Sequence, residues 1–169
     1  HKLIICGDLF DRGSEAVELQ NFILELIEKD EVILIKGNHE ELLVDMLNSW
    51  HRASYLESHH NSNGTVDTVL QLTSSRLADL YDNPSDVYYK MKETPFMQKI
   101  LTAMVDYFET ENHIFVYGWI PCERIRQNPY AVTYFAIDDW RKASAKQWSS
   151  ARWINGMDAA YDGVIDENK

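Results

Sequence analysis

Two short apolar runs, each followed at once by a polar loop that contains glycine, constrain this chain more than any other feature. The run within residues 2–6 leads into the loop GDLFDRG, and the run within residues 31–35 leads into KGNHE. Between them, residues 15–28 carry apolar side chains at helical spacing. A right-handed crossover joins such a strand, helix and strand, and it makes the two strands parallel and adjacent. The sequence therefore predicts an α/β fold organised around this unit.

The two loops carry the side chains from which we predict a functional site, because loops at the carboxyl ends of parallel strands meet at one edge of a sheet. Asp8 has two carboxylate oxygens that can each serve one metal ion of a pair. Asn38 offers a hard, neutral oxygen to a metal or to substrate. Arg12 can hold two phosphate oxygens with its planar guanidinium. His39 can protonate a leaving oxygen while Asp11 orients its ring, so these five residues predict a metal and phosphate site.

At these residues the sequence resembles the calcineurin-like metallophosphoesterases, whose patterns GDxxDRG and GNHE are matched by GDLFDRG and GNHE. The form with arginine is similar to the branch that contains the serine/threonine protein phosphatases and the symmetrical dinucleoside-tetraphosphate hydrolases. The resemblance implies hydrolysis of phosphate monoesters or phosphoanhydrides by a water that two divalent ions, Mn, Fe or Zn, activate. The implied substrate is a phosphoprotein or a nucleotide.

The resemblance also implies a role for each of the five residues. Asp8 would bridge the two metals, and Asn38 would ligate the second one. His39 and Asp11 would form the acid pair, and Arg12 would bind phosphate.

The fold that the resemblance implies is a partial metallophosphoesterase sandwich, a mixed sheet flanked by helices, in a single domain over residues 1–169. A helical cap insertion of about residues 51–108 would lie beside the site and shape substrate choice. Apolar periodicity predicts helices over residues 66–80, 86–93 and 96–108 within it. Downstream, the pattern predicts a turn at 109–112, a strand at 113–117 and a tryptophan-rich helix at 138–153.

Two neighbouring histidines, His59 and His60, lie in the polar segment 51–64, which the composition predicts to be a loop. Adjacent loop positions are not a recognised spacing for metal ligands. We therefore expect a structural or solvent-facing role for both side chains.

The family pattern asks for more metal ligands than the two loops supply. An Asp-x-His motif would precede residue 3 and a Gly-His motif would follow the acidic tail, and neither is in the sequence. A histidine would end the strand at 113–117, but Tyr117 stands there, and its phenol, with an ordinary pKa of about 10, is a poor ligand. We therefore expect a truncated or impaired form that binds metal weakly or not at all, which leaves open whether the chain is an enzyme.

Two other interpretations stay open. The chain could be a degenerate, non-catalytic relative that acts as a binding or scaffold protein, or an unrelated α/β module that binds phosphate. In a partial sandwich the sheet edges would be exposed, and exposed edges recruit further strands. We therefore expect a homo-oligomer formed through these edges.

The net charge of −11 and the pI of about 4.9 argue against broad binding of nucleic acid or of an anionic membrane. An anionic substrate remains compatible, because metals and Arg12 would dominate the local field. No run reaches the roughly 18 apolar residues of a membrane span, and no signal peptide is visible, so we expect a cytoplasmic protein. The two cysteines, Cys6 and Cys122, do not make a disulfide framework.

Overall fold

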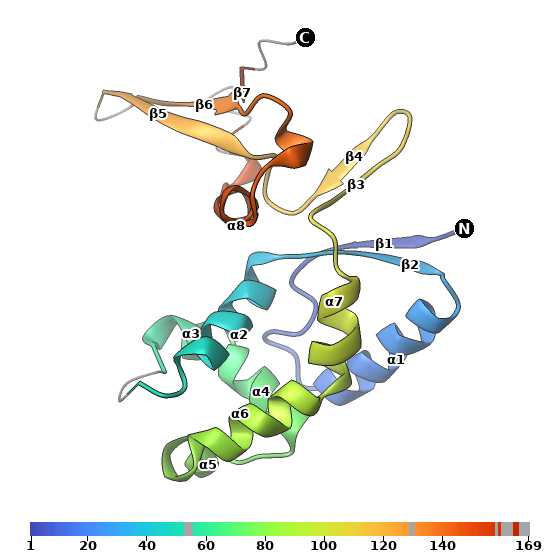
Figure 1. The fold of residues 1–169 in the computed structure, drawn as a ribbon, viewed down its shortest axis with the longest axis vertical. Coiled ribbons are helices and arrows are strands. Elements are labelled where there is room, and N and C mark those ends of the chain that lie inside the picture. Colours follow the sequence, from blue (N-terminus) through green and yellow to red (C-terminus); the bar gives the residue numbers. More distant parts are fainter. Residues whose placement is uncertain (53–55, 129–130, 158, 160–163, 166–169) are drawn as a thin grey trace. The chain divides into compact units, whose positions relative to one another are not determined.

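The computed structural model is a mixed α/β structure, as the sequence predicts, and its residues form two compact units (Figure 1). The first unit is His1–Val105 and the second is Asp106–Lys169. The structure describes residues 1–52, 56–128, 131–157, 159 and 164–165.

The predicted strand–helix–strand unit opens the first unit. Strand β1 (Leu3–Cys6) pairs in parallel with β2 (Val32–Ile35), in a register that sets Leu3 opposite Val32. Helix α1 (Ala16–Glu28) connects them and buries Ile23. The prediction of adjacent parallel strands joined by a helix is confirmed. It could be made from the sequence because short β-branched runs and a 3.6-residue period are local signals.

The rest of the first unit is helical, and Figure 1 shows its helices gathered on one side of the β1–β2 pair. The elements are α2 (Asn38–Ser49), α3 (Ser58–Ser62), α4 (Thr65–Thr73), α5 (Leu77–Asp82), α6 (Pro84–Glu93), a π-helical turn (Phe96–Ile100) and α7 (Leu101–Ala103). Their apolar faces form one core with α1 and β2, which includes Ile23, Leu34, Leu43, Met46, Val69, Met91, Phe96 and Ile100.

The predicted loop and helix between residues 51 and 80 are wrong in detail. Part of the expected loop 51–64 forms α3, and the expected helix 66–80 is two helices. The break occurs at Ser74, whose φ of 51° is left-handed, while the Ser75 N–H returns to the Leu70 carbonyl at 3.0 Å. This is a helix C-terminus closed by backbone bonds, which apolar spacing alone does not reveal.

The predicted continuous helix 96–108 is also wrong, because the chain leaves the helical conformation after Ala103. Val105 donates its N–H to the Leu34 carbonyl and accepts from the Lys36 N–H, both at 2.9 Å. The backbone of Val105 thus adds a parallel bridge to β2. Val105 fits the helical apolar period, but pairing with a buried strand decides its conformation.

The second unit is built mainly from strands. A hairpin of β3 (Tyr107–Glu109) and β4 (Ile114–Val116) contains the predicted strand and turn, whereas the second sheet was not predicted. That sheet contains β5 (Cys122–Asn128), β6 (Ala131–Ala136) and β7 (Val164–Ile165), with β5–β6 antiparallel and β6–β7 parallel.

The predicted helix 138–153 is two shorter elements, a 3₁₀ turn (Trp140–Lys142) and α8 (Ala145–Arg152). Ser144 separates them and caps α8 by accepting the Gln147 N–H. The tryptophans act as packing residues, since Trp148 stacks on Tyr107 with ring centres 5.6 Å apart.

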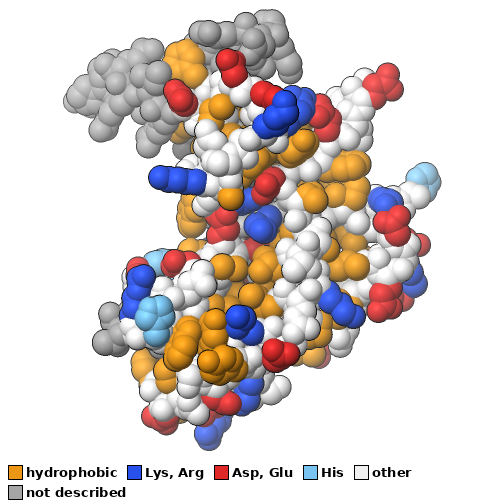
Figure 2. All heavy atoms as spheres, viewed as in Figure 1, with side chains coloured by type: hydrophobic (Ala, Val, Ile, Leu, Met, Phe, Trp, Pro, Cys, Tyr) orange, Lys and Arg blue, Asp and Glu red, His pale blue; other side chains and the backbone are white. Residues whose placement is uncertain are grey.

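Acidic and basic side chains are interspersed on the face shown in Figure 2. None of the helices in the part of the chain that the structure describes is long and apolar enough to cross a lipid bilayer.

Replacing Gln20 by Met is expected to lower the free energy of unfolding by about 1–3 kcal/mol. Gln20 is buried, and its Oε1 accepts the Phe96 N–H at 2.8 Å. Methionine fills a similar volume but leaves that N–H unpaired. Denaturant titration measures the change. The exposed Gln98→Met is the control and should change stability by less than about 0.5 kcal/mol; equal effects of the two variants would contradict the assignment.

Candidate functional site

The loop after β1 turns sharply at the residues of the first motif. Gly7, Asp8 and Arg12 all have positive φ, of 69°, 53° and 69°. Left-handed backbone is costly for residues with a side chain, and such positions cluster at functional sites, where surrounding contacts hold them in place. The contacts that hold this loop come mostly from the start of α2 and from α4.

Glu40 fixes the loop to the start of α2. Its buried carboxylate accepts backbone N–H groups from Gly37 at 2.7 Å, Leu9 at 3.0 Å and Asp8 at 3.2 Å. Burial raises the pKa of the Glu40 carboxyl, partly offset by these three hydrogen bonds. Sequence reasoning gave Glu40 no role, although a Glu three positions after a helix N-cap is the signal of a capping box.

Gly37 allows the two loops to approach each other closely. A Cβ at this position would lie 2.5 Å from the Asp8 carboxylate oxygen Oδ1 and 2.6 Å from the Asp8 backbone nitrogen. A side chain would therefore force the loops apart. The glycine of the second motif is required by this close approach to Asp8.

His39 lies between the two aspartates of the first loop. Its ring nitrogen Nδ1 is 2.8 Å from Asp11 Oδ2, and its Nε2 is 3.7 Å from Asp8 Oδ2. The His39 backbone N–H also donates to Asp8 Oδ1 at 3.3 Å. A carboxylate at Nδ1 fixes the ring orientation and keeps a proton there, which leaves Nε2 to exchange a proton with a reacting group.

Two threonines of α4 hold Asp11 in place. The Thr65 hydroxyl donates to Asp11 Oδ2 at 2.6 Å, and the Thr68 hydroxyl donates to Asp11 Oδ1 at 2.8 Å. Both threonines are fully buried. Together with His39, they give the Asp11 carboxylate three hydrogen-bond partners. The sequence did not reveal the role of either threonine, because the helical spacing of apolar residues in this segment predicts a helix and says nothing about its polar side chains.

Asn38 begins α2, and its side-chain oxygen Oδ1 is buried without a hydrogen-bond partner among the described residues. A buried carbonyl oxygen without a donor is costly unless a cation or another group satisfies it. The carboxylate of Asp8 is one-third exposed. Asp8 and Asn38 therefore fit the oxygen ligands that a hard divalent ion prefers.

Arg12 is oriented by the junction of α3 and α4 rather than by the other motif residues. Its guanidinium Nη2 donates to Asn63 Oδ1 at 2.7 Å. Gly64, with φ of 84°, lies against it, since a Cβ there would be 2.6 Å from the Arg12 backbone nitrogen. The structure thus brings His39 into contact with both Asp8 and Asp11, and it fixes Arg12 through Asn63.

A hollow of about 550 Å³ opens beside Asp11. Its lining combines apolar side chains of the loop and of α1 with carboxylates at the start of α1, and includes Leu9, Leu19, Phe22, Glu15 and Glu18.

Comparison with family models places both motif loops within a known family. A family model described as calcineurin-like phosphoesterase matches residues 1–145, which include both loops and α4. Searches of curated proteins and of solved structures gave no match.

Replacing Glu40 by Gln is expected to lower the free energy of unfolding by about 1–3 kcal/mol, because the amide NH₂ cannot accept and at least one backbone N–H loses its acceptor. Thermal or denaturant unfolding measures the loss. Glu18→Gln, at an exposed position of α1, is the control and should stay within about 0.5 kcal/mol. A Glu40→Gln protein as stable as the wild type would show that the carboxylate does not hold the loops.

Proposed function

Because the chain belongs to the calcineurin-like phosphoesterase family, we propose that it hydrolyses phosphate monoesters or phosphoanhydrides with a metal-activated water, as an impaired relative of the serine/threonine phosphatase branch. The observation that carries the proposal is the position of His39 between Asp8 and Asp11, across the two loops. The proposed substrates are a phosphoprotein or a nucleotide.

His39 is the proton donor in this proposal. Asp11 holds one proton of the His39 ring on Nδ1. When the ring carries a second proton, on Nε2, it gives that proton to the leaving oxygen as the bond to phosphorus breaks, and the neutral ring remains. Thr65 and Thr68 support this step indirectly, because they fix the carboxylate that orients the ring. An Asp–His pair supported in this way resists reorientation while the substrate binds.

Asp8 and Asn38 are the residues that would hold the divalent ions. Two such ions, Mn, Fe or Zn, polarise a phosphoryl oxygen and lower the pKa of a bound water when they are present. The buried oxygen of Asn38, which has no hydrogen-bond partner in the part of the chain that the structure describes, and the accessible carboxylate of Asp8 support this assignment. The left-handed φ of Asp8 adds to it, because the hydrogen bonds with Glu40 and with the His39 backbone hold this residue in a costly conformation.

Arg12 is the proposed phosphate ligand. Its Nη2 donates to Asn63, and the remaining N–H groups of the fork are the donors that a phosphate would engage. Asn63 would therefore set the direction from which Arg12 approaches the substrate.

The alternative is a non-catalytic relative that binds phosphorylated ligands or acts as a scaffold. Tyr117, which follows β4 where the family pattern has a histidine ligand, favours it. Hydrolysis of a generic aryl phosphate with added Mn²⁺ or Zn²⁺ separates the two functions, since the alternative predicts phosphate binding without turnover. The homo-oligomer and the cytoplasmic location remain predictions.

Replacing His39 by Gln is expected to lower kcat for an aryl phosphate by roughly 10²–10⁴-fold with little change in KM, because the leaving oxygen loses its proton donor. Steady-state kinetics with saturating metal measures both constants. Arg12→Ala should instead raise KM and weaken the binding of inorganic phosphate. The assignment of His39 fails if kcat is unchanged for a substrate with a poor leaving group.

Replacing Thr65 by Val is expected to lower kcat by roughly tenfold, an effect smaller than that of His39→Gln, because Asp11 keeps two of its three partners. The control is Thr73→Val in the same helix, where the wild-type threonine hydroxyl donates to the Val69 carbonyl at 2.7 Å. Equal loss of kcat in both variants would mean that the effect is a general loss of stability.

A further inference from the structure

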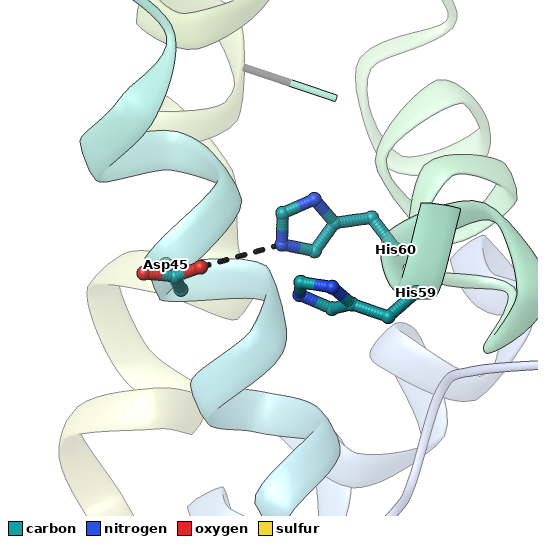
Figure 3. Close-up of side chains that lie close together, drawn as sticks. All are labelled: Asp45, His59 and His60. Atoms are coloured by element: carbon teal, nitrogen blue, oxygen red, sulfur yellow. Dashed lines mark ion pairs between the residues drawn. The ribbon is translucent and has the colours of Figure 1, made fainter. Parts of the chain in front are cut away.

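A second cluster of ligand-type side chains lies in the first unit, on other elements than the motif residues. Asp45 projects from α2, and His59 and His60 project toward it from α3 (Figure 3). Each offers one nitrogen or oxygen atom, and these three atoms all lie within 4.8 Å of one another. The short α3 helix therefore brings two adjacent histidines to one carboxylate.

His60 is the buried member of the cluster. Its side chain has no exposed surface, and its Nε2 has no hydrogen-bond partner among the described residues. Asp45 Oδ2 lies 3.4 Å from this Nε2. This separation exceeds the usual length of a hydrogen bond. It is close to the spacing of about 3.3 Å between neighbouring ligand atoms around a tetrahedral zinc ion, whose bonds are about 2.0–2.1 Å long.

His59 and Asp45 keep the cluster accessible to an ion from solvent. The side chains of His59 and Asp45 are 41% and 62% exposed. In Figure 2, histidine and acidic side chains reach the surface over the part of the first unit that contains α2 and α3. The Nδ1 of His59 lies 3.4 Å from Glu57 Oε2. Histidine ligands commonly have a carboxylate near the ring nitrogen that does not bind the metal, and Nε2 of His59 would then be the ligating atom.

We propose that Asp45, His59 and His60 bind one divalent ion of the zinc class, with three protein ligands and water at the fourth position. Two imidazoles and one carboxylate are a donor set that zinc accepts, whereas Mg²⁺ and Ca²⁺ prefer oxygen ligands alone. This site does not depend on the proposed function, because neither Asp8 nor Asn38, the proposed active-site metal ligands, belongs to it. The adjacency of the histidines, which argues against a metal site in the sequence, is overcome by the fold of α3.

Binding of the ion changes one hydrogen bond of α3. The Nδ1 of His60 accepts the Glu57 backbone N–H at 3.2 Å, so the proton of the neutral ring sits on Nε2. Ligation through Nε2 moves that proton to Nδ1 and removes the acceptor of Glu57. Burial lowers the pKa of His60, which favours the neutral ring that a metal requires. Loss of the Glu57 bond is therefore a specific signature of metal at His60.

The test is a calorimetric Zn²⁺ titration of the full chain in an Asp8→Asn background, which weakens the proposed active-site metal centre. One tight equivalent is expected to remain. Asp45→Asn and His59→Gln, at partly exposed positions that tolerate substitution, should each weaken that equivalent by tenfold or more. His51→Gln, at an exposed histidine outside the cluster, is the matched control and should leave it unchanged.

Nitrogen-15 NMR of the histidine rings adds a readout at His60 itself. Zn²⁺ is expected to move the ring proton from Nε2 to Nδ1 and to shift the Glu57 amide signal. The proposal is overturned if the Asp8→Asn protein binds no zinc, if His51→Gln weakens binding as much as His59→Gln, or if zinc leaves the His60 nitrogens unchanged. If Asp8→Asn has no effect on metal stoichiometry, the proposed active-site metals fail while the zinc site stands.

Discussion

The buried carboxylate of Glu40 is the contact on which the arrangement of the two motif loops depends. It accepts hydrogen bonds from the backbone N–H groups of Asp8, Leu9 and Gly37, and so joins the two loops. A buried carboxylate without such partners would be strongly disfavoured. Because hydrogen bonds to an ionised acceptor are stronger than neutral ones, one side chain can hold a loop in left-handed backbone. The orientation of Asp8 and the first turn of α2 follow from this contact.

The same logic extends from Glu40 to His39 and Asp11. His39 is the residue before Glu40 on α2, so the position of α2 carries its ring toward the first loop. Thr65 then donates to the Asp11 oxygen that also faces His39, and Thr68 donates to the other oxygen of this carboxylate. Each buried polar group in this network has a hydrogen-bond partner on a different element. A polar network whose members are all paired across elements fixes a single geometry.

The sequence predicts those features that local chemistry decides. The strand–helix–strand unit and the five motif residues are visible because apolar period, glycine and charge act over a few residues. The contacts of Thr65 and Thr68 with Asp11 span more than 50 residues and need the tertiary fold to be seen. At Val105 a local signal misleads: the residue fits the helical apolar period, but its backbone pairs with β2 instead of continuing the helix. The left-handed Ser74 breaks a helix through backbone bonds that carry no side-chain signal.

The threonines of α4 also bear on how such a chain can change during evolution. A region that only covered a site could be exchanged for a different one while the catalytic loops stayed as they are. Here an exchange of residues 51–108 would remove two of the three donors to the Asp11 carboxylate and the Asn63 oxygen that orients Arg12. New specificity would therefore have to arise by point substitutions that spare these residues.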